Sequence, residues 1–346
     1  MALLTNQLIR WFRKNKRDLP WRENPTPYCV WISEIMLQQT VVNAVIPYFR
    51  KWMEKYPDIA HLAKAKEAEV LRMWEGLGYY ARARNIFKAA IEIEKKFGGR
   101  MPETWEEWRG LPGIGDYTAS AIMSIAFGKP YPVLDANVRR VGRRILGMAA
   151  WDKKREKELL EFLREAMPRK NPGAFNEALM ELGQKVCLPD KPLCEKCPVK
   201  RFCIGFEKNI QNLIPGKADR KITKKKTYLA LFVSRGKLLI VKREKGILKD
   251  LWGFPEFQEE GEIASFIKKE GGRRFKETGK LKARIHYYTR FRDELIPFVY
   301  EVEKQFGGNA GSRRWVSFNE LEKYPLPSVY RKILEELLLK TCPAKI

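Results

Sequence analysis

Long apolar runs are missing from this sequence. No stretch is long enough to span a bilayer, and the N-terminus lacks the apolar core of a secretory signal peptide. Internal repeats and low-complexity tracts are also absent. Acidic residues are scarce beside basic ones, with 42 Asp and Glu against 67 Lys and Arg. These absences disfavour a membrane-spanning protein and a secreted, disulfide-stapled one, so we expect a protein of the reducing cytoplasm.

The formal net charge of +25 indicates a polyanionic partner, which is either nucleic acid or an anionic membrane. Solubility alone does not require so large an excess, since a small domain stays soluble with a net charge of roughly 2 to 8. No amphipathic anchor or lipidation motif accompanies the basic residues. We therefore expect the partner to be nucleic acid.

Four of the six cysteines lie within residues 187–203, in the pattern C-x6-C-x2-C-x5-C. Three prolines in this segment exclude a regular helix or a central strand, so we expect a loop folded around a metal. Two disulfides would need an oxidising compartment. Four thiolates suit either an iron–sulfur cluster or a tetrahedral zinc ion, and the spacing leaves both open. The expected ligands are Cys187, Cys194, Cys197 and Cys203, whereas the isolated Cys29 and Cys342 are expected to be free thiols.

A length of 346 residues favours two domains. Residues 1–203 show helical periodicity, with breaks rich in proline and glycine between the segments. Residues 204–226 include a basic, polar stretch, and we interpret them as a linker. The expected helical segments are 31–50, 64–74, 82–97, 117–127, 137–147, 153–166 and 174–186.

Residues 227–346 have a different pattern, which is typical of a separate α+β domain. Two short apolar runs flank Ser234-Arg235-Gly236, a sequence that predicts a hairpin turn. The expected strands are 228–233, 237–241, 284–289 and 296–302, and the expected helices lie near 261–269 and 328–340.

A glycine-containing turn, Leu111-Pro-Gly-Ile-Gly115, joins one helical segment to a second that starts near Tyr117. Its two glycines allow a tight turn and a close approach of the backbone to a partner. The backbone amides then point outward at the N-terminus of the following helix, where the helix dipole favours an anion. Such a turn can hold a DNA phosphate without reading the base sequence, and we assign this contact to Leu111, Gly113 and Gly115.

Two carboxylates occupy different environments. Glu34 lies mid-helix among apolar residues, a setting that raises the pKa of a carboxyl group and lets it hold and donate a proton near neutral pH. Asp135 precedes the helical run 137–146 at an expected N-cap, where the helix dipole and backbone amides favour an anion. Taken alone, such a glutamate is more often solvated and such an aspartate only a cap. Two carboxyl groups whose surroundings push their pKa values apart are, however, typical of sites for acid–base chemistry.

The glycine-containing turn, Asp135 and the cysteine pattern together resemble the helix-hairpin-helix DNA glycosylase superfamily, also called endonuclease III-like. Within it, residues 33–40 (SEIMLQQT) and 76–84 (GLGYYARAR) resemble the adenine DNA glycosylases. The resemblance is dense over residues 5–205 and looser beyond them. It implies that the four cysteines hold a 4Fe–4S cluster, that Glu34 protonates N7 of a flipped adenine, and that Asp135 stabilises the sugar centre.

Position 117 separates subfamilies of this superfamily. Relatives that also cleave the DNA backbone carry a lysine there, whose amine attacks the sugar as a Schiff-base nucleophile. Tyr117 is a poor nucleophile, so the resemblance implies a monofunctional glycosylase in which Tyr117 and Asn137 support Asp135 and the attacking water. A tyrosine here is also compatible with thymine–guanine mismatch glycosylases. Ala136 departs from the usual glycine after the aspartate, and we expect its methyl group to be tolerated at the start of a helix.

Base flipping requires residues that fill the vacated stack and a pocket that holds the base. By resemblance, Gln39 and Tyr79 insert into the stack near the base opposite the flipped adenine. Aromatic residues at such spacings are otherwise more often part of a core. The residues that resemble the wall of the adenine pocket are Arg17, Leu19, Trp21, Arg22 and Glu177.

Residues 227–340 resemble the Nudix-like domain with which adenine glycosylases recognise 8-oxoguanine, through LLIVKR at 238–243 and LWGFPE at 251–256. No Nudix hydrolase carboxylate box follows Gly253, so we expect no pyrophosphatase activity. Where the family usually has Phe-Ser-His, this chain has Tyr288, Thr289 and Arg290. The hydroxyl is kept, and a guanidinium replaces the imidazole as a donor to a purine edge or a phosphate.

The expected function is removal of adenine opposite 8-oxoguanine or guanine in double-stranded DNA. We expect a monomeric, cytoplasmic, nucleoid-associated enzyme of a prokaryote. A thymine–guanine mismatch glycosylase is disfavoured by the extra domain, and a Nudix hydrolase by its missing box. A non-catalytic iron–sulfur protein that binds DNA or senses redox state would leave Glu34 and Asp135 without a role. The cysteine loop is expected to be structural, with neighbouring basic residues that contact phosphates.

Overall fold

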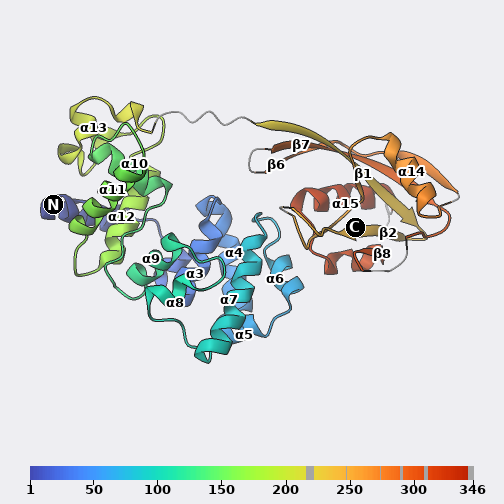
Figure 1. Cartoon of the computed structure of the whole chain (residues 1–346), viewed down its shortest axis with the longest axis horizontal. Coiled ribbons are helices and arrows are strands. Elements are labelled where there is room, and N and C mark those ends of the chain that lie inside the picture. The colour runs from blue at the N-terminus through green and yellow to red at the C-terminus, as the bar shows by residue number, and fades with distance from the viewer. Residues whose placement is uncertain (216–221, 247, 273, 289–290, 308–310, 342–346) are drawn as a thin grey trace. The chain divides into compact units, whose positions relative to one another are not determined.

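The computed structural model describes residues 1–215, 222–246, 248–272, 274–288, 291–307 and 311–341. The chain forms two compact units, which we call the helical unit and the sheet unit (Figure 1). The helical unit comprises Met1–Ala65 and Asn85–Ala218, and the sheet unit comprises Lys66–Arg84 and Asp219–Ile346. Residues 66–84 therefore group with the C-terminal part of the chain and not with the helices that flank them in sequence. This combination of a helical part and a part built on a sheet confirms the predicted fold class.

Helices joined by short loops build the first part of the chain. No helix in the described ranges is both long and apolar enough to cross a bilayer. The helices are α1 (Ala2–Asn15), α2 (Pro20–Glu23), α3 (Pro27–Leu37), α4 (Val42–Lys55), α5 (Ile59–Ala63), α6 (Glu67–Met73), α7 (Ala81–Phe97), α8 (Trp105–Arg109), α9 (Asp116–Ile125), α10 (Ala136–Ile145), α11 (Lys153–Ala166), α12 (Pro172–Lys185) and α13 (Ile204–Glu207).

One predicted helix, 31–50, is in fact two helices. The first, α3, ends at Leu37, because Gln38 adopts φ −58° and ψ 113° and Gln39 adopts a left-handed φ of 56°. A residue in the left-handed region cannot continue a right-handed helix. Neither glycine nor proline marks this break, so periodicity alone could not predict it. The segments predicted at 82–97, 117–127, 137–147, 153–166 and 174–186 correspond to α7 and α9 to α12 within a few residues.

The core that supports the site lies between α1 and α9 to α12. Leu8, Leu159, Phe175 and Leu182 are fully buried in it. The N-terminus of α12 is capped locally, since the side chain of Asn171 accepts a hydrogen bond from the third residue of this helix. Burial of this apolar face supplies the rigidity on which the side chains of the site are mounted.

A buried amide fixes the loop that leads into α10. Asn176 of α12 is fully buried, and its Nδ2 donates to Ser124 Oγ at 2.8 Å and to the carbonyl oxygen of Tyr131 at 2.9 Å. Its Oδ1 accepts from the backbone amide of Val133 at 3.2 Å. These three hydrogen bonds join α12 to α9 and to the loop before Asp135, which helps to set where α10 begins.

The sheet unit is built on one mixed sheet, in which the described residues form eight strands. Its central pair, β1 and β7, is parallel, whereas the other pairs are antiparallel. The elements are β1 (Thr223–Ser234), β2 (Lys237–Lys242), β3 (Trp252–Gly253), β4 (Glu256–Phe257), α14 (Gly261–Lys269), β5 (Phe275–Lys280), β6 (Arg284–Tyr288), β7 (Phe291–Val302), β8 (Arg313–Ser317) and α15 (Ser328–Thr341).

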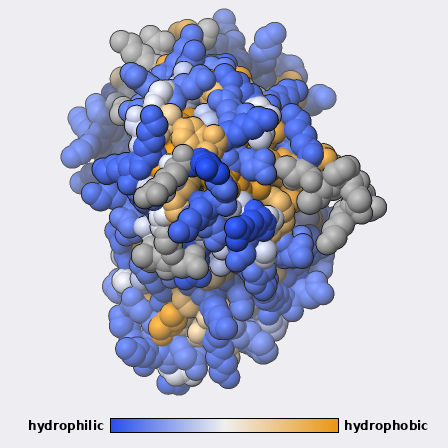
Figure 2. All heavy atoms as spheres, turned by 90° about the vertical axis from the view of Figure 1, so that its right-hand side faces the viewer, coloured by the Kyte–Doolittle hydropathy of each residue, from blue (hydrophilic) through white to orange (hydrophobic). Residues whose placement is uncertain are grey.

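Alternation along β1 supplies both faces of this sheet with core residues. Leu229 and Leu231 pack in a cluster that contains Ile333 and Leu337 of α15, whereas Ala230 and Phe232 pack in a cluster with residues of α14. The predicted turn between β1 and β2 is present, with Arg235 at φ 49° and Gly236 at φ 71°. On the face shown in Figure 2, hydrophilic side chains predominate and apolar ones form small patches.

The segment 204–226, which we expected to be a linker, contains regular structure at both ends. Helix α13 follows the cysteine loop directly, and Gly205 within it is buried. Strand β1 begins at Thr223, because the backbone of Thr223–Thr227 pairs in parallel with Phe291–Leu295 of β7. A backbone ladder needs no apolar side chains, so the lysine-rich start of β1 carries no periodic signal.

Candidate active site

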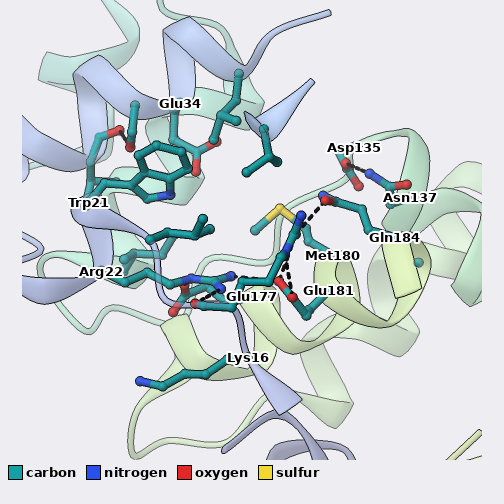
Figure 3. A pocket seen from close by; sticks show the side chains of 18 of the residues that line it. Lys16, Trp21, Arg22, Glu34, Asp135, Asn137, Glu177, Met180, Glu181 and Gln184 are labelled. Atoms are coloured by element: carbon teal, nitrogen blue, oxygen red, sulfur yellow. Dashed lines mark hydrogen bonds and ion pairs between the residues drawn. The ribbon is translucent and has the colours of Figure 1, made fainter. Parts of the chain in front are cut away.

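A cavity of about 1040 Å³ lies in the helical unit, between α2 and α3 on one side and α10 and α12 on the other (Figure 3). Most of the side chains predicted for catalysis and for the base pocket line this cavity. They are Arg17, Leu19, Trp21, Arg22, Glu34, Gln39, Tyr117, Asp135, Asn137 and Glu177.

Glu34 projects from α3 into this cavity and is 6% exposed, in agreement with its apolar neighbours in sequence. Burial raises the pKa of its carboxyl group to about 7, and the negative charges of Asp135 and Glu177 act in the same direction. The hydrogen bond from Tyr117 and the charge of Arg22 partly oppose this rise in pKa. Glu34 can therefore hold a proton near neutral pH and donate it.

Tyr117 lies near the start of α9, next to the glycine-containing turn. Its hydroxyl donates to Glu34 Oε2 at 2.7 Å and lies 3.4 Å from Met180 Sδ. We expected this hydroxyl to support Asp135, but its hydrogen bond goes to Glu34 instead. Burial, together with the charges of Glu34 and Asp135, raises the pKa of Tyr117 well above its usual value, so the phenol stays neutral.

Asp135 is the N-cap of α10, as the sequence predicts. Its Oδ1 accepts from the backbone amide of Val138 at 2.6 Å, and its Oδ2 accepts from Asn137 Nδ2 at 2.8 Å. The Oδ1 of Asn137 accepts in turn from Arg140 Nη2 at 3.0 Å, and Arg140 Nε donates to the carbonyl oxygen of Cys187 at 2.9 Å. Both oxygens of Asp135 thus accept hydrogen bonds at the N-terminus of a helix, which fixes the orientation of the carboxyl group.

Arg22 and Glu177 form one wall of the cavity. Arg22 Nε donates to Glu177 Oε1 at 2.7 Å, and the side chains of both residues are largely buried, at 14% and 18% exposure. Leu19 and Trp21, at 5% and 7% exposure, add apolar surface to the same cavity. This combination of apolar walls with a few directed polar groups is typical of a site that binds a small organic group.

Sequence reasoning missed several polar or polarisable residues on the cavity face of α12 and on α10. Met180, Glu181 and Gln184 line the cavity together with Glu177, and they follow it at spacings of three, four and seven residues. Residues at these spacings share one face of a helix, so once Glu177 is assigned to the pocket, the others can be predicted. Arg140 also lines the cavity.

Gln39 and Tyr79, the predicted stack-inserting residues, both have left-handed backbones. Gln39 adopts φ 56° and Tyr79 φ 48°, the latter between Gly78 at φ 70° and a helix. Residues other than glycine rarely adopt such angles, and strain of this kind concentrates at functional sites. Gln39 lines the cavity of the helical unit, whereas Tyr79 belongs to the sheet unit.

The glycine-containing turn places its two glycines differently. Gly113 has φ 77°, and a Cβ there would lie 2.5 Å from Asn85 Cβ, so only glycine fits. Gly115 is the N-cap of α9, and nothing lies within 4 Å of a Cβ built on it. The side chain of Leu111 is buried, at 4% exposure, so the predicted contact of Leu111 with a phosphate would be made by its backbone. A phosphate at this turn would be held by backbone amides.

The four clustered cysteines are free thiols that line one small cavity. Arg144 is buried beside them, and its Nη1 donates to Cys187 Sγ at 3.3 Å, while its carbonyl oxygen accepts from Cys203 Sγ at 3.2 Å. Burial raises the pKa of the Cys197 thiol to about 12. Within the part of the chain that the structure describes, no three His, Cys, Asp or Glu side chains are grouped to hold a metal ion. The donor chemistry, four thiols that line one cavity, is that of an iron–sulfur cluster, but in this structure the thiols are not drawn together as the ligands of one metal group.

Cys29 is also a free thiol, as expected, whereas Cys342 lies outside the described residues. In the sheet unit, the hydroxyl of Tyr288 donates to Asp293 Oδ2 at 3.0 Å, which anchors the end of β6 to β7. Thr289 and Arg290, the other two residues predicted to recognise 8-oxoguanine, lie outside the described residues.

The arrangement of two domains agrees with known families. Residues 32–165 match the family described as HhH-GPD superfamily base excision DNA repair protein, and residues 227–336 match the NUDIX domain family. The helical part is similar in structure to a thermostable thymine-DNA glycosylase, with a TM-score of 0.56 and 31% identity over 60% of this chain and 96% of that one. It is also similar to endonuclease III in a non-covalent DNA complex, with a TM-score of 0.52 and 25% identity over 60% of this chain and 95% of that one.

Similarity in sequence extends over nearly the whole chain. The adenine DNA glycosylase of Buchnera aphidicola from Acyrthosiphon pisum is 34% identical over 340 residues, which cover 96% of this chain and 97% of that protein. The human adenine DNA glycosylase is 43% identical over 207 residues, which cover 57% of this chain and 38% of that protein. The chain therefore belongs to the adenine DNA glycosylase family of base excision repair enzymes.

Proposed function

We propose that this protein removes adenine mispaired with 8-oxoguanine or guanine from double-stranded DNA, by flipping the adenine into the cavity and hydrolysing its N-glycosidic bond. The observation that carries the proposal is the pair of unlike carboxyl groups in one cavity. Glu34 is buried, with a pKa raised to about 7, and Asp135 accepts two hydrogen bonds at the start of α10. The names of the full-length relatives support adenine as the base.

In this mechanism Glu34 acts as the general acid. It donates its proton to N7 of the flipped adenine, which makes the base a better leaving group when the bond to the sugar breaks. Asp135 faces the positive charge that develops on the sugar, and its carboxylate stabilises that charge until water adds. The proton that the water loses returns to a carboxylate of the site. Tyr117 holds the Glu34 carboxyl group in place through its 2.7 Å hydrogen bond.

The reaction needs no covalent step through an amine. Tyr117 occupies the position of the Schiff-base lysine, and its raised pKa leaves the phenol neutral. Lys16 also lines the cavity, but Figure 3 shows its amino group directed away from Glu34 and Asp135. We therefore propose a monofunctional glycosylase, which leaves an intact abasic site.

Adenine recognition is assigned to the wall that contains Arg22 and Glu177. The hydrogen bond from Arg22 occupies one Glu177 oxygen, and a carboxylate can accept further hydrogen bonds, for which the exocyclic amino group of adenine is a suitable donor. Leu19 and Trp21 pack against the flat faces of the base. Gln39 and Tyr79 are proposed to fill the stack that the base leaves.

Cys187, Cys194, Cys197 and Cys203 would hold the 4Fe–4S cluster of the family. Such a cluster, with all ligand positions filled by protein, would cross-link the cysteine loop and would leave no coordination position open for a substrate. The chain's own residues around it, Arg144 above all, tie the cysteine loop to α10, the helix that Asp135 caps.

We propose a glycosylase domain over 1–203 and a Nudix-like domain over 227–346 that recognises 8-oxoguanine through Tyr288, Thr289 and Arg290. The basic segment 204–226 would join them, with α13 at its start and the first residues of β1 at its end. The partner is DNA, and the enzyme acts as a monomer at the nucleoid. A second candidate function, excision of thymine mispaired with guanine, is favoured by the likeness of the helical part to a thymine-DNA glycosylase and by Tyr117.

One experiment separates the candidate functions. Purified protein is incubated with duplexes that contain a single A:8-oxoguanine, A:G or T:G pair, and abasic sites are then cleaved with alkali. We expect strand cleavage for the two adenine duplexes only after alkali. Processing of T:G alone would replace our proposal by the second candidate, and processing of none would favour a non-catalytic DNA-binding protein.

A further inference from the structure

Glu181, on α12, is a fully buried carboxylate beneath the wall of the cavity. Arg17 holds it with two hydrogen bonds, from Nε to Oε1 at 2.7 Å and from Nη2 to Oε2 at 3.0 Å. Arg22 donates to the same Oε2 from its Nη2 at 3.1 Å. Figure 3 shows Glu177 and Glu181 on α12, with the side chain of Arg22 reaching toward them.

These contacts leave Arg22 no freedom to turn. Its Nε is held by Glu177, its Nη2 by Glu181 and its Nη1 by the carbonyl oxygen of Arg17 at 3.0 Å. The guanidinium also lies 5.2 Å from the ring centre of Phe12. Arg17 is held in a similar way, since its Nη2 also donates to Gln184 Oε1 at 2.6 Å. The group of four charged side chains has no net charge, because two guanidinium groups face two carboxylates.

Stability alone does not explain this arrangement. Replacing a buried ion pair by apolar side chains of the same volume often leaves the stability of a protein unchanged or raises it, because taking the charges out of water is costly. What Glu181 does provide is orientation, because a bidentate contact with one guanidinium and a single contact with another define the positions of both. The result is a rigid wall on which Glu177 presents its carboxylate to the cavity.

We propose that Glu181 is a positioning residue for base excision, which fixes Arg17 and Arg22 and neutralises their charge next to the general acid. This inference rests on the proposed function, in which Glu34 is that acid. Glu181 acts through Arg22 and touches neither the base nor the sugar.

The electrostatic part of this role has a definite sign. The groups that face Glu34 are Tyr117 of α9, Asp135 at the start of α10, Glu177 of α12 and Arg22 of α2. Arg22 lowers the pKa of Glu34, so an Arg22 that has lost its Glu181 partner lowers it further. Since protonated Glu34 is the active form, excision then fails at a lower pH than in the unchanged protein.

The test uses full-length protein and single-turnover excision of adenine from an A:8-oxoguanine duplex between pH 6 and 9. For E181Q, we expect the alkaline limb of the profile to move by roughly half a pH unit to lower pH, which makes the rate above the limb about threefold lower. For R17Q, which leaves the charge of Glu181 in excess, we expect a shift to higher pH. The matched control is E158Q, which makes the same chemical change in an exposed ion pair with Arg155, and we expect its limb to stay in place.

A merely structural role gives a different result. If Glu181 had only a structural role, the rate of E181Q would fall by the same factor at every pH, and the proposal would be wrong. The proposal would also be wrong if the alkaline limb moved in the same direction in E181Q and R17Q. Carbon-13 NMR titration of the Glu34 carboxyl group in each variant, identified by the loss of its signal in E34Q, measures the same shift without catalysis. If the unchanged protein excises no adenine, the proposed function fails, while the titration still decides the role of Glu181.

Discussion

Two glutamates line the same cavity from opposite walls, and the difference between them shows what controls a buried charge. Glu34 on α3 is 6% exposed, and burial raises its pKa to about 7. Glu181 on α12 is buried completely, and burial also acts to raise its pKa, but hydrogen bonds and charges from Arg17 and Arg22 lower it below the usual value. The depth of burial alone therefore does not set the protonation state of a carboxyl group. The carboxyl group that accepts hydrogen bonds from Arg17 and Arg22 stays ionised, whereas Glu34, which accepts one from Tyr117, keeps a proton available.

We expect the largest effect on the excision rate from the loss of the acidic proton of Glu34, on α3. In E34Q the side chain keeps its size and loses the acid, so we expect the single-turnover rate of adenine excision to fall by about 10²- to 10⁴-fold. Binding of the same duplex, measured by fluorescence anisotropy, is expected to stay within about threefold, since the substitution leaves the phosphate contacts intact. A variant that kept full activity would remove Glu34 from the mechanism.

The next effect tests whether Asp135 is more than a cap. Asparagine caps a helix about as well as aspartate, so we expect D135N to change the free energy of unfolding by less than about 1 kcal/mol. Without the negative charge, the excision rate is expected to fall by about 10²- to 10³-fold. Urea denaturation and single-turnover kinetics on the same preparation separate the two roles. Loss of stability with an unchanged rate would leave only the capping role.

The contributions of the two glutamates to folding stability are expected to change with pH in opposite directions. The folded-state pKa of Glu34 lies above its unfolded value, so its contribution to stability is full at low pH and is lost as the pH rises through about 7. We expect E34Q to be more stable than the unchanged protein above pH 8, by about 3 kcal/mol at most.

The folded-state pKa of Glu181 is lowered, so its contribution is present above the unfolded value and is lost as the pH falls through the lowered one. We therefore expect E181Q to be less stable than the unchanged protein at neutral pH, and this deficit to shrink on acidification. Urea denaturation at pH 5, 7 and 8.5 measures both trends. Parallel trends for the two variants would mean that Arg17 and Arg22 do not distinguish the two sites.

The smallest effect concerns the hydrogen bond from Tyr117 to Glu34. This bond favours the carboxylate, so its loss in Y117F raises the pKa of Glu34 further. We expect the alkaline limb of the excision profile to move to higher pH by less than about one unit, with a change in the maximal rate below about tenfold. A limb that moved to lower pH would show that the phenol supports the protonated form instead.

Much of the helical unit follows from local patterns. Breaks at proline and glycine separate the segments that became α9 to α12, and Asp135 could be assigned as an N-cap because a capping residue directly precedes its helix. The turn at Arg235 and Gly236 was predictable for the same reason, since its conformation depends on the residues themselves. The break at Gln38 and Gln39 was not, because neither residue type disfavours a helix enough to mark it.

By itself, the sequence determined the basic charge, the four-thiol pattern, the apolar neighbours of Glu34 and the family to which the chain belongs, because these depend on composition and on neighbours along the chain. Only the tertiary structure decided that Tyr117 donates to Glu34, that β1 and β7 pair in parallel, and that Glu181 joins Arg17 to Arg22. Each of these depends on contacts between segments far apart in sequence, up to 164 residues in the case of Arg17 and Glu181. Local periodicity carries no information about such partners, and the protonation state of a buried group is set by them.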